Sequence, residues 1–221
     1  MVSRPFSLDL PVCIIGAGGF ARETLACLHD LLAGTGHLLR DVACFSEEDE
    51  RYGPTELLGV PVQRRSAFDA ARYRAVVAVG ESRAREQVVK RLPPDTRFAT
   101  LVHPSAVVAP WAEVGEGSIV MAGAVLTTDV RLGRHAHVNL HASVGHDCVA
   151  GDYLTLAPGA RLSGECRLGK RVYVGTNAAV RQGLTIADDV MVGMGAVVIA
   201  SIAESGGTYV GVPAFRLNHG R

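Results

Sequence analysis

Residues 108–144 read VAPWAEVGEGSIVMAGAVLTTDVRLGRHAHVNLHASV, and an aliphatic side chain returns at every sixth position of this stretch. The series continues to Val198, and only Ala150 departs from Val, Ile or Leu. A second series, two places earlier in each hexad, carries small or medium-sized residues from Ala106 to Ala196. We predict that both series point inward.

A period of six fits neither the 3.6-residue turn of a helix nor the simple alternation of an open sheet. It fits a solenoid in which each hexad forms one short strand and one corner, so that three hexads close a triangular coil. The hexads of this chain then predict about five coils. We expect glycines to occupy tight corners with positive φ. The glycines concerned are Gly115, Gly133, Gly145, Gly151, Gly169, Gly175 and Gly193.

Composition excludes several classes of protein. The 221 residues carry no net formal charge, which argues against a nucleic-acid partner. Residues 1–10 show no export signal, and no window is apolar enough to span a membrane, so a cytoplasmic protein is expected. The 5 cysteines include no CxxC pair, which favours buried free thiols over a disulfide framework or a zinc site.

The first hundred residues predict a small parallel α/β unit. Strands are expected at 10–15, 41–46 and 75–80, and helices at 23–32 and 81–92. Between the first strand and helix lies Gly16-Ala17-Gly18-Gly19-Phe20-Ala21, a turn in which backbone N–H groups can approach a phosphate. The unit is too short for a full dinucleotide domain, so NAD is disfavoured. A tight turn that only packs helix against strand is the structural alternative.

The hexads resemble those of the hexapeptide-repeat acyltransferases. This resemblance implies a left-handed parallel β-helix and a homotrimer with active sites between subunits. A Rossmann-like module at 1–102, followed by a β-helix at 103–221 that begins with His103-Pro104-Ser105-Ala106, resembles the bacterial nucleotide-sugar acetyltransferases. These comprise N-acetyltransferases for nucleotide-linked 4-amino sugars and sialic acid O-acetyltransferases. The resemblance implies acetyl-CoA-dependent N-acetylation of a nucleotide-linked amino sugar, in support of polysaccharide biosynthesis.

One histidine stands out for catalysis. His146 lies two residues after an inward valine, near a corner, and Asp147 follows it directly. A carboxylate in contact with the ring raises the histidine pKa and makes it a stronger base. The segment Gly145-His146-Asp147-Cys148 resembles the catalytic segment of the family, which assigns His146 as general base and Asp147 as its supporting acid. An exposed corner histidine without a partner is the structural alternative.

The resemblance also implies contacts for both substrates. The nucleotide sugar is expected at Gly18, Gly19, Phe20, Gly80 and Glu81. Acetyl-CoA is expected along the outside of the coils, near Asn139, Thr155, Gly164, Gly175, Thr176, Gly193 and Met194. Thr155 is a departure, since several family members carry a histidine at this position. Gly211-Val212-Pro213-Ala214 resembles the motif that closes the helix in this family.

Three alternatives stay open from the sequence. The acceptor can be a sugar hydroxyl, as in the sialic acid enzymes, or the solenoid can be a non-catalytic trimeric binding protein. A carbonic-anhydrase-like metal site would use His135, His137, His141 and His146, although no metal is expected. Cys148 belongs to the inward series, so direct attack by the acceptor is preferred over a covalent acyl-cysteine.

Overall fold

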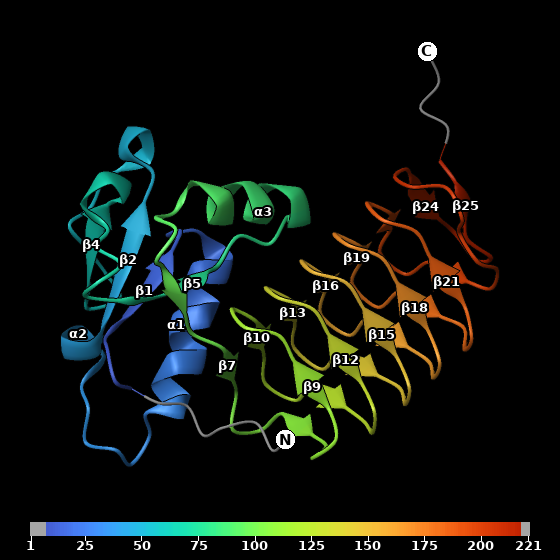
Figure 1. Ribbon diagram of the computed structural model, residues 1–221, viewed down its shortest axis with the longest axis horizontal. Helices are drawn as coiled ribbons and strands as arrows, with labels where there is room; N and C mark the ends of the chain where they lie inside the picture. Colours follow the sequence, from blue (N-terminus) through green and yellow to red (C-terminus); the bar gives the residue numbers. More distant parts are fainter. Residues whose placement is uncertain (1–7, 218–221) are drawn as a thin grey trace.

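The computed structural model describes residues 8–217, which form an α/β unit followed by a parallel β-solenoid (Figure 1). Residues 1–7 and 218–221 lie outside this description, and with them most of the stretch examined for an export signal. Among the residues described, no helix is both long enough and apolar enough to cross a membrane.

The α/β unit contains a six-stranded sheet in the order β3-β4-β2-β1-β5-β6, parallel except for the β3–β4 pair. Its elements are β1 (Val12–Ile15), α1 (Gly19–Leu31), α2 (Leu39–Val42), β2 (Ala43–Glu47), β3 (Glu56–Leu57), β4 (Val60–Arg64), β5 (Arg74–Val77), α3 (Ser82–Arg91) and β6 (Arg97–Phe98). Two 3-10 turns cover Asp49–Arg51 and Arg65–Ala67. Every predicted strand and helix is present, whereas β3, β4, β6 and α2 were not predicted.

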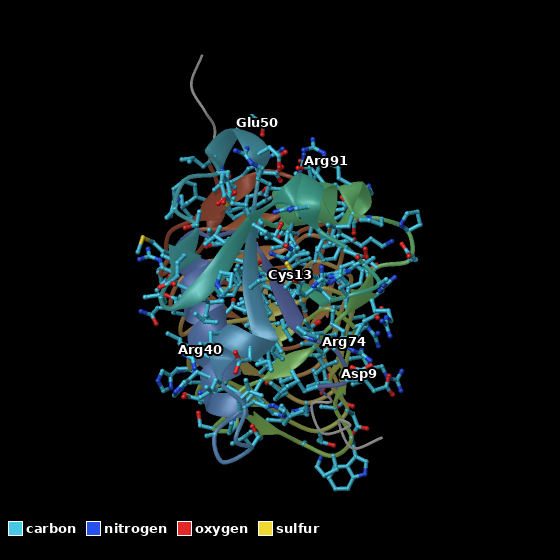
Figure 2. The ribbon with its side chains drawn as sticks, turned by 90° about the vertical axis from the view of Figure 1, so that its left-hand side faces the viewer. Asp9, Cys13, Arg40, Glu50, Arg74 and Arg91 are labelled. Carbon is cyan, nitrogen blue, oxygen red and sulfur yellow. The ribbon has the colours of Figure 1, made fainter. Side chains whose placement is uncertain are left out.

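Strand β1 is apolar throughout because both faces of the sheet are covered. Val12 and Ile14 pack in one core with α1, and Cys13 and Ile15 pack in another beneath the end of α3. Figure 2 looks onto this unit and places Cys13 in its interior, with Asp9 and Arg74 together at the rim. These two residues form an ion pair, with 2.6 Å between Arg74 Nε and Asp9 Oδ1.

The solenoid has three parallel sheets of eight, six and five strands, the first ending in the antiparallel β24–β25 pair. Ile119 pairs with His137 and His137 with Thr155, so one coil takes 18 residues, as three hexads require. The first sheet holds β7 (Leu101–Val102), β10 (Ile119–Val120), β13 (His137–Val138), β16 (Thr155–Leu156), β19 (Tyr173–Val174), β22 (Met191–Val192), β24 (Thr208–Val210) and β25 (Phe215–Arg216).

The other two sheets complete the triangular section. The second holds β8 (Val107–Val108), β11 (Val125–Leu126), β14 (Ser143–Val144), β17 (Arg161–Leu162), β20 (Ala179–Val180) and β23 (Val197–Val198). The third holds β9 (Glu113–Val114), β12 (Arg131–Leu132), β15 (Val149–Ala150), β18 (Arg167–Leu168) and β21 (Thr185–Ile186). Both predicted inward series line the single core of the solenoid, which confirms the register. All five cysteines are buried and free, as expected.

The predicted reason for the corner glycines is wrong. Positive φ does recur every six residues, from Gly117 to Gly195, but at a different hexad position that mostly carries non-glycine residues such as Asp129 and Asn177. Glycines of the predicted set are needed for space instead. A Cβ on Gly133 would lie 2.6 Å from the backbone nitrogen of Asp152 in the next coil. Stacking of coils, not chain reversal, therefore requires glycine there.

The α/β unit packs directly on the first coils. Leu101, Ile119 and Met121 of the solenoid share a core with Leu25 and Leu28 of α1. Strand β7 already pairs with β10, so the first sheet of the solenoid begins two residues before position 103. Figure 1 shows α3 lying over the sheet that contains β10, β13 and β16. The substrate-binding turns predicted in the α/β unit are thereby held close to the coils.

Candidate active site

Two edges of the solenoid carry the predicted catalytic and donor-binding residues. The His146 edge joins the sheet of β14 to the sheet of β15 and consists of residues 145–148 and 163–166. The Asn139 edge joins the sheet of β13 to the sheet of β14 and consists of residues 139–142, 157–160, 175–178 and 193–196. The sheet of β8, β11, β14, β17, β20 and β23 lies between them, and we call it the inter-edge face.

His146 and Asp147 form a hydrogen-bonded pair on the His146 edge. The distance from His146 Nδ1 to Asp147 Oδ2 is 2.8 Å, and the two side chains are 55% and 59% exposed. Since a carboxylate only accepts, Nδ1 carries the proton and Nε2 keeps a free lone pair. The hydrogen bond that the ring donates to the Asp147 carboxylate raises the pKa of His146 above its ordinary value. The predicted partnership is present, and Nε2 is the atom able to take a proton.

Gly164 lies directly beneath the His146 ring. A Cβ at position 164 would stand 2.5 Å from His146 Nε2 and 2.6 Å from its Cε1. The two residues are 18 apart and therefore occupy the same place in successive coils. Glycine at 164 leaves room for the imidazole to lie flat along the edge, which fixes where Nε2 points.

The remaining predicted donor contacts, except Thr155, lie on the Asn139 edge. Asn139 is 7% exposed, and its Nδ2 donates to Leu156 O at 2.8 Å. Met194 is 78% exposed, which is unusual for a large apolar side chain. The set on this edge consists of Asn139, Gly175, Thr176, Gly193 and Met194. Within one chain, the whole inter-edge face separates this set from His146.

Thr155 departs from the expectation of a donor contact. Its side chain is 2% exposed, beneath the α/β unit on the sheet of β13 and β16. Its hydroxyl bonds Gly80 O at 3.0 Å and Ser82 Oγ at 3.1 Å, and receives a bond from Arg85 Nη2 at 2.9 Å. Each hydrogen-bonding position of the hydroxyl is used within the chain. Thr155 therefore joins the two units and is removed from the donor-binding set.

The predicted nucleotide-sugar residues meet at one place in the α/β unit. Strand β1 pairs with β2 on one side and β5 on the other, so the chain order reverses between β1 and β5. Gly18, Gly19 and Phe20 follow β1, and Gly80 and Glu81 follow β5. Ligands of open parallel sheets bind at such a switch point. Gly18 caps α1 without a side-chain hydrogen bond, which leaves the first N–H groups of that helix to a ligand.

This switch point lies beside the Asn139 edge. The Phe20 ring is 4.8 Å from the ring of His137, and Leu140 packs in the same core as Phe20. The two turns and the Asn139 edge therefore lie close together within one chain. The His146 edge lies on the other side of the inter-edge face.

Two of the other histidines, His135 and His137, are buried in structural environments. Nδ1 of His137 faces the guanidinium of Arg85 at 3.1 Å, so Nε2 carries the proton and donates to Val77 O at 3.0 Å. His135 is buried between Phe98 and Tyr153. Within residues 8–217, no three His, Cys, Asp or Glu side chains are grouped in a way that could hold a metal ion.

A cavity of about 590 Å³ opens near the far end of the solenoid. Among the predicted site residues it touches only Glu81, and it is otherwise lined by residues such as Arg83, Arg171, Tyr173 and Arg216. Neither His146 nor the glycine turn reaches it. We place the site at the two edges and not in this cavity, because the groups able to do chemistry are there.

Arg85, which contacts the turn after β5, was not among the predicted site residues. Its position on α3 was the available signal, because Ser82 and Arg85 are three apart on the buried face of that helix. A charged residue on the helix face that packs against the protein interior indicates a buried polar contact.

Comparisons with known proteins identify relatives of both units of the chain. Residues 11–92 match the family described as the PglD N-terminal domain. Over 152 residues, the chain is 32% identical to the GDP-perosamine N-acetyltransferase of Escherichia coli O157:H7. That alignment spans 66% of this chain and 66% of the relative, just under two thirds of its length.

Two solved structures are similar over nearly the whole chain. One is the acetyltransferase domain of PglB from Neisseria gonorrhoeae FA1090 in complex with acetyl coenzyme A, at TM-score 0.82 and 31% identity, covering 94% of this chain and 98% of that one. The other is PerB from Caulobacter crescentus in complex with CoA and GDP-perosamine, at TM-score 0.80 and 31% identity, covering 95% and 98%.

Proposed function

Since this chain belongs to the hexapeptide-repeat sugar acetyltransferases that carry a PglD-type N-terminal domain, we propose that it transfers the acetyl group of acetyl-CoA to the amino group of a nucleotide-linked amino sugar. The observation that carries this proposal is the hydrogen-bonded His146–Asp147 pair, whose imidazole is more than half exposed and has its Nε2 next to Gly164. We place the reaction in the cytoplasm and in the supply of sugars for polysaccharide biosynthesis, on the resemblance alone.

The proposed chemistry is direct transfer. The sugar amine attacks the thioester carbonyl carbon while His146 Nε2 removes a proton from the nitrogen. The tetrahedral intermediate then collapses, the C–S bond breaks, and the CoA sulfur leaves with a proton supplied by the imidazolium. Asp147 holds the ring in the tautomer that leaves Nε2 basic and stabilises the imidazolium while it exists.

Acetyl-CoA and the nucleotide sugar take the surfaces already described. We assign the donor to Gly164 on one edge and to Asn139, Gly175, Thr176, Gly193 and Met194 on the other. The nucleotide is assigned to Gly18, Gly19, Phe20, Gly80 and Glu81, with a phosphate at the start of α1, whose N–H groups and dipole favour negative charge.

The division of these residues between two edges supports a homotrimer. One copy offers the nucleotide turns and the Asn139 edge, and a neighbouring copy can offer His146 from its other edge. The inter-edge face would then point toward the three-fold axis. Its outward residues are mostly small and uncharged, namely Val107, Val125, Ser143, Ala179 and Val197, with Arg161 the exception. The sheet of β9, β12, β15, β18 and β21 instead presents three charged residues, Glu113, Arg131 and Arg167, beside Val149 and Thr185.

The proposal is tested by release of the CoA thiol from acetyl-CoA with GDP-perosamine and UDP-linked 4-amino sugars as acceptors, and with sialic acid as a hydroxyl acceptor. We expect N-acetylated product from an amino sugar, identified by mass spectrometry. His146→Gln should lower kcat by about 10²–10⁴-fold. A product acetylated only on oxygen would indicate the sialic acid type of enzyme. Binding without transfer would indicate a binding protein, and full activity of His146→Gln would remove the assigned base.

A further inference from the structure

Arg85 is the only Lys, Arg, Asp or Glu side chain among residues 8–217 that is fully buried, at 0% exposure. No carboxylate of the described chain lies within salt-bridge distance of it. Its charge is met only by neutral acceptors, and burial lowers its pKa to about 9. Burial of a charge without an ionic partner is energetically unfavourable. The hydrogen bonds of the Arg85 guanidinium must therefore offset that cost.

On the solenoid side, the guanidinium bonds two successive coils. Nε donates to His135 O at 3.0 Å. Nη2 donates to Tyr153 O at 2.9 Å, to Leu154 O at 3.0 Å and to Thr155 Oγ1 at 2.9 Å. These acceptors belong to β16 and to the corners that precede β13 and β16. Three of them are backbone carbonyls, which cannot turn away if the arginine shifts.

On the α/β side, the same guanidinium bonds the turn that follows β5. Nη1 donates to Val79 O at 2.8 Å and to Gly80 O at 3.1 Å. Thr155 Oγ1 also bonds Gly80 O, and Ser82 Oγ contacts Thr155 Oγ1. The turn of residues 79–82, which we call the β5–α3 turn, is thus fixed to the coils by polar contacts at each of its ends.

We propose that Arg85 is a positioning residue for the acceptor substrate. It fixes the height of the β5–α3 turn above the coils, and therefore the place of the nucleotide sugar relative to the acetyl donor. This rests on the proposed function, because Gly80 and Glu81 are nucleotide contacts only under that proposal. Arg85 touches no reacting atom.

The two units are also held together by contacts that do not involve Arg85. Leu101, Ile119 and Met121 of the solenoid already share an apolar core with α1. This core lies on the α1 side of the sheet, whereas Arg85 acts at the opposite side through α3. Loss of the guanidinium should therefore leave the unit attached and release only the β5–α3 turn.

The test uses Arg85→Lys and Arg85→Met in the full-length enzyme. Lysine keeps the charge but cannot span acceptors on both sides, because it lacks the planar five-donor fork. We expect the KM for the amino sugar that the wild type acetylates to rise about tenfold or more, while the KM for acetyl-CoA stays within about twofold. Arg85→Met should show the same split with a lower kcat. The matched control is Arg91→Met, which removes an exposed arginine from the same helix.

Equal changes in both KM values, or none in a folded Arg85→Met protein, would overturn the proposal and leave Arg85 a purely structural residue. If neither variant folds, Thr155→Val removes the hydroxyl that ties Gly80 to the coils and should give a weaker form of the same split. An unchanged amino-sugar KM in Thr155→Val would then count against it. A wild-type enzyme with no acetyl transfer would instead disprove the proposed function, so the two failures are distinguishable.

Discussion

At the residue scale, Asp147 has two separate tasks. Its carboxylate orients His146, and its backbone occupies the left-handed region with φ of 59°. Asparagine tolerates that conformation as well as aspartate does. Asp147→Asn therefore removes the charge without disturbing the corner, which makes it a clean probe of the pair.

We predict that Asp147→Asn shifts the acidic limb of the pH profile of kcat/KM to lower pH. His146 must be neutral to accept a proton, and Asp147 raises its pKa by stabilising the charged ring. Without the carboxylate the pKa falls, so the neutral form appears at lower pH, while the plateau rate drops because the base is weaker. Profiles of both proteins from pH 5 to 9 provide the measurement. Superimposable limbs would show that the carboxylate does not act on the catalytic ring.

The sequence could predict the contact between His146 and Asp147 because the two residues are adjacent and occupy a corner of a regular repeat. It could not predict the surroundings of Thr155. Where that hydroxyl points depends on α3 lying across β16, a contact between segments about 70 positions apart. Periodicity shows that Thr155 faces outward from the core, but it does not show what covers it.

At the element scale, the corners of the solenoid make two separate demands. One hexad position must adopt positive φ, and it accepts Asp, Asn, His, Tyr and Arg as well as glycine. At the corners of Gly133 and the other glycines of its series, a second position must lack a side chain because the next coil passes too closely. At other corners the same hexad position carries a side chain, as Asn139 and Ser163 show. The sequence shows where glycine recurs but not why. It therefore predicts positive φ at glycines that are in fact needed for space.

We predict that Gly133→Ala destabilises the protein far more than Gly183→Asn. A Cβ on Gly133 would overlap backbone atoms of the next coil, and these atoms cannot shift without moving the rest of that coil. Overpacking of this kind costs about 1–3 kcal/mol. Gly183 has φ of 71° and nothing within 4 Å of an added Cβ, and Asn177 already occupies the same hexad position. The measurement is the urea midpoint of each variant. Equal losses would mean that conformation, not stacking, selects glycine.

At the scale of the whole molecule, the three outer faces of the solenoid differ in character. One is covered by the α/β unit, one is charged, and the inter-edge face is mostly small and uncharged. The outward positions of every strand could be identified from the hexad register. Which face the α/β unit covers could not, because that depends on how the chain turns between β6 and β7.

We predict that Ala179→Glu on the inter-edge face breaks the proposed trimer into monomers and abolishes acetyl transfer, since three like charges would meet near the proposed axis. Thr185→Glu places the same charge on the third sheet and should leave both trimer and activity intact. Light scattering after size-exclusion chromatography and the CoA-release assay report the two properties. An active Ala179→Glu trimer would refute the assignment of this face.

Acid should destabilise the fold through two buried histidines. Burial lowers the pKa of His135 to about 4 and that of His137 well below 6.5. Between those values and 6.5 the unfolded chain binds more protons, so stability is complete above pH 6.5 and declines as the pH falls toward 4. Each histidine contributes a slope of up to about 1.4 kcal/mol per pH unit.

We expect urea midpoints at fixed protein concentration to fall between pH 7.5 and 5. His135→Phe should reduce that fall, because it removes one of the two titrating rings. Tyr153 shows that an aromatic residue tolerates this hexad position, where its φ is 62°. A pH dependence identical to that of the wild type would mean that His135 does not contribute.

Because one coil takes 18 residues, the length of the solenoid can change by whole coils. Inserting one complete coil would lengthen the prism by about 4.8 Å, the spacing of neighbouring strands, and leave every later side chain on its original edge. Inserting a single hexad would instead rotate everything downstream by one edge and move Met194 away from the surface it shares with Asn139. The length of a groove between two solenoids can thus change by one coil at a time. The side chains that line the groove keep their positions around the solenoid axis.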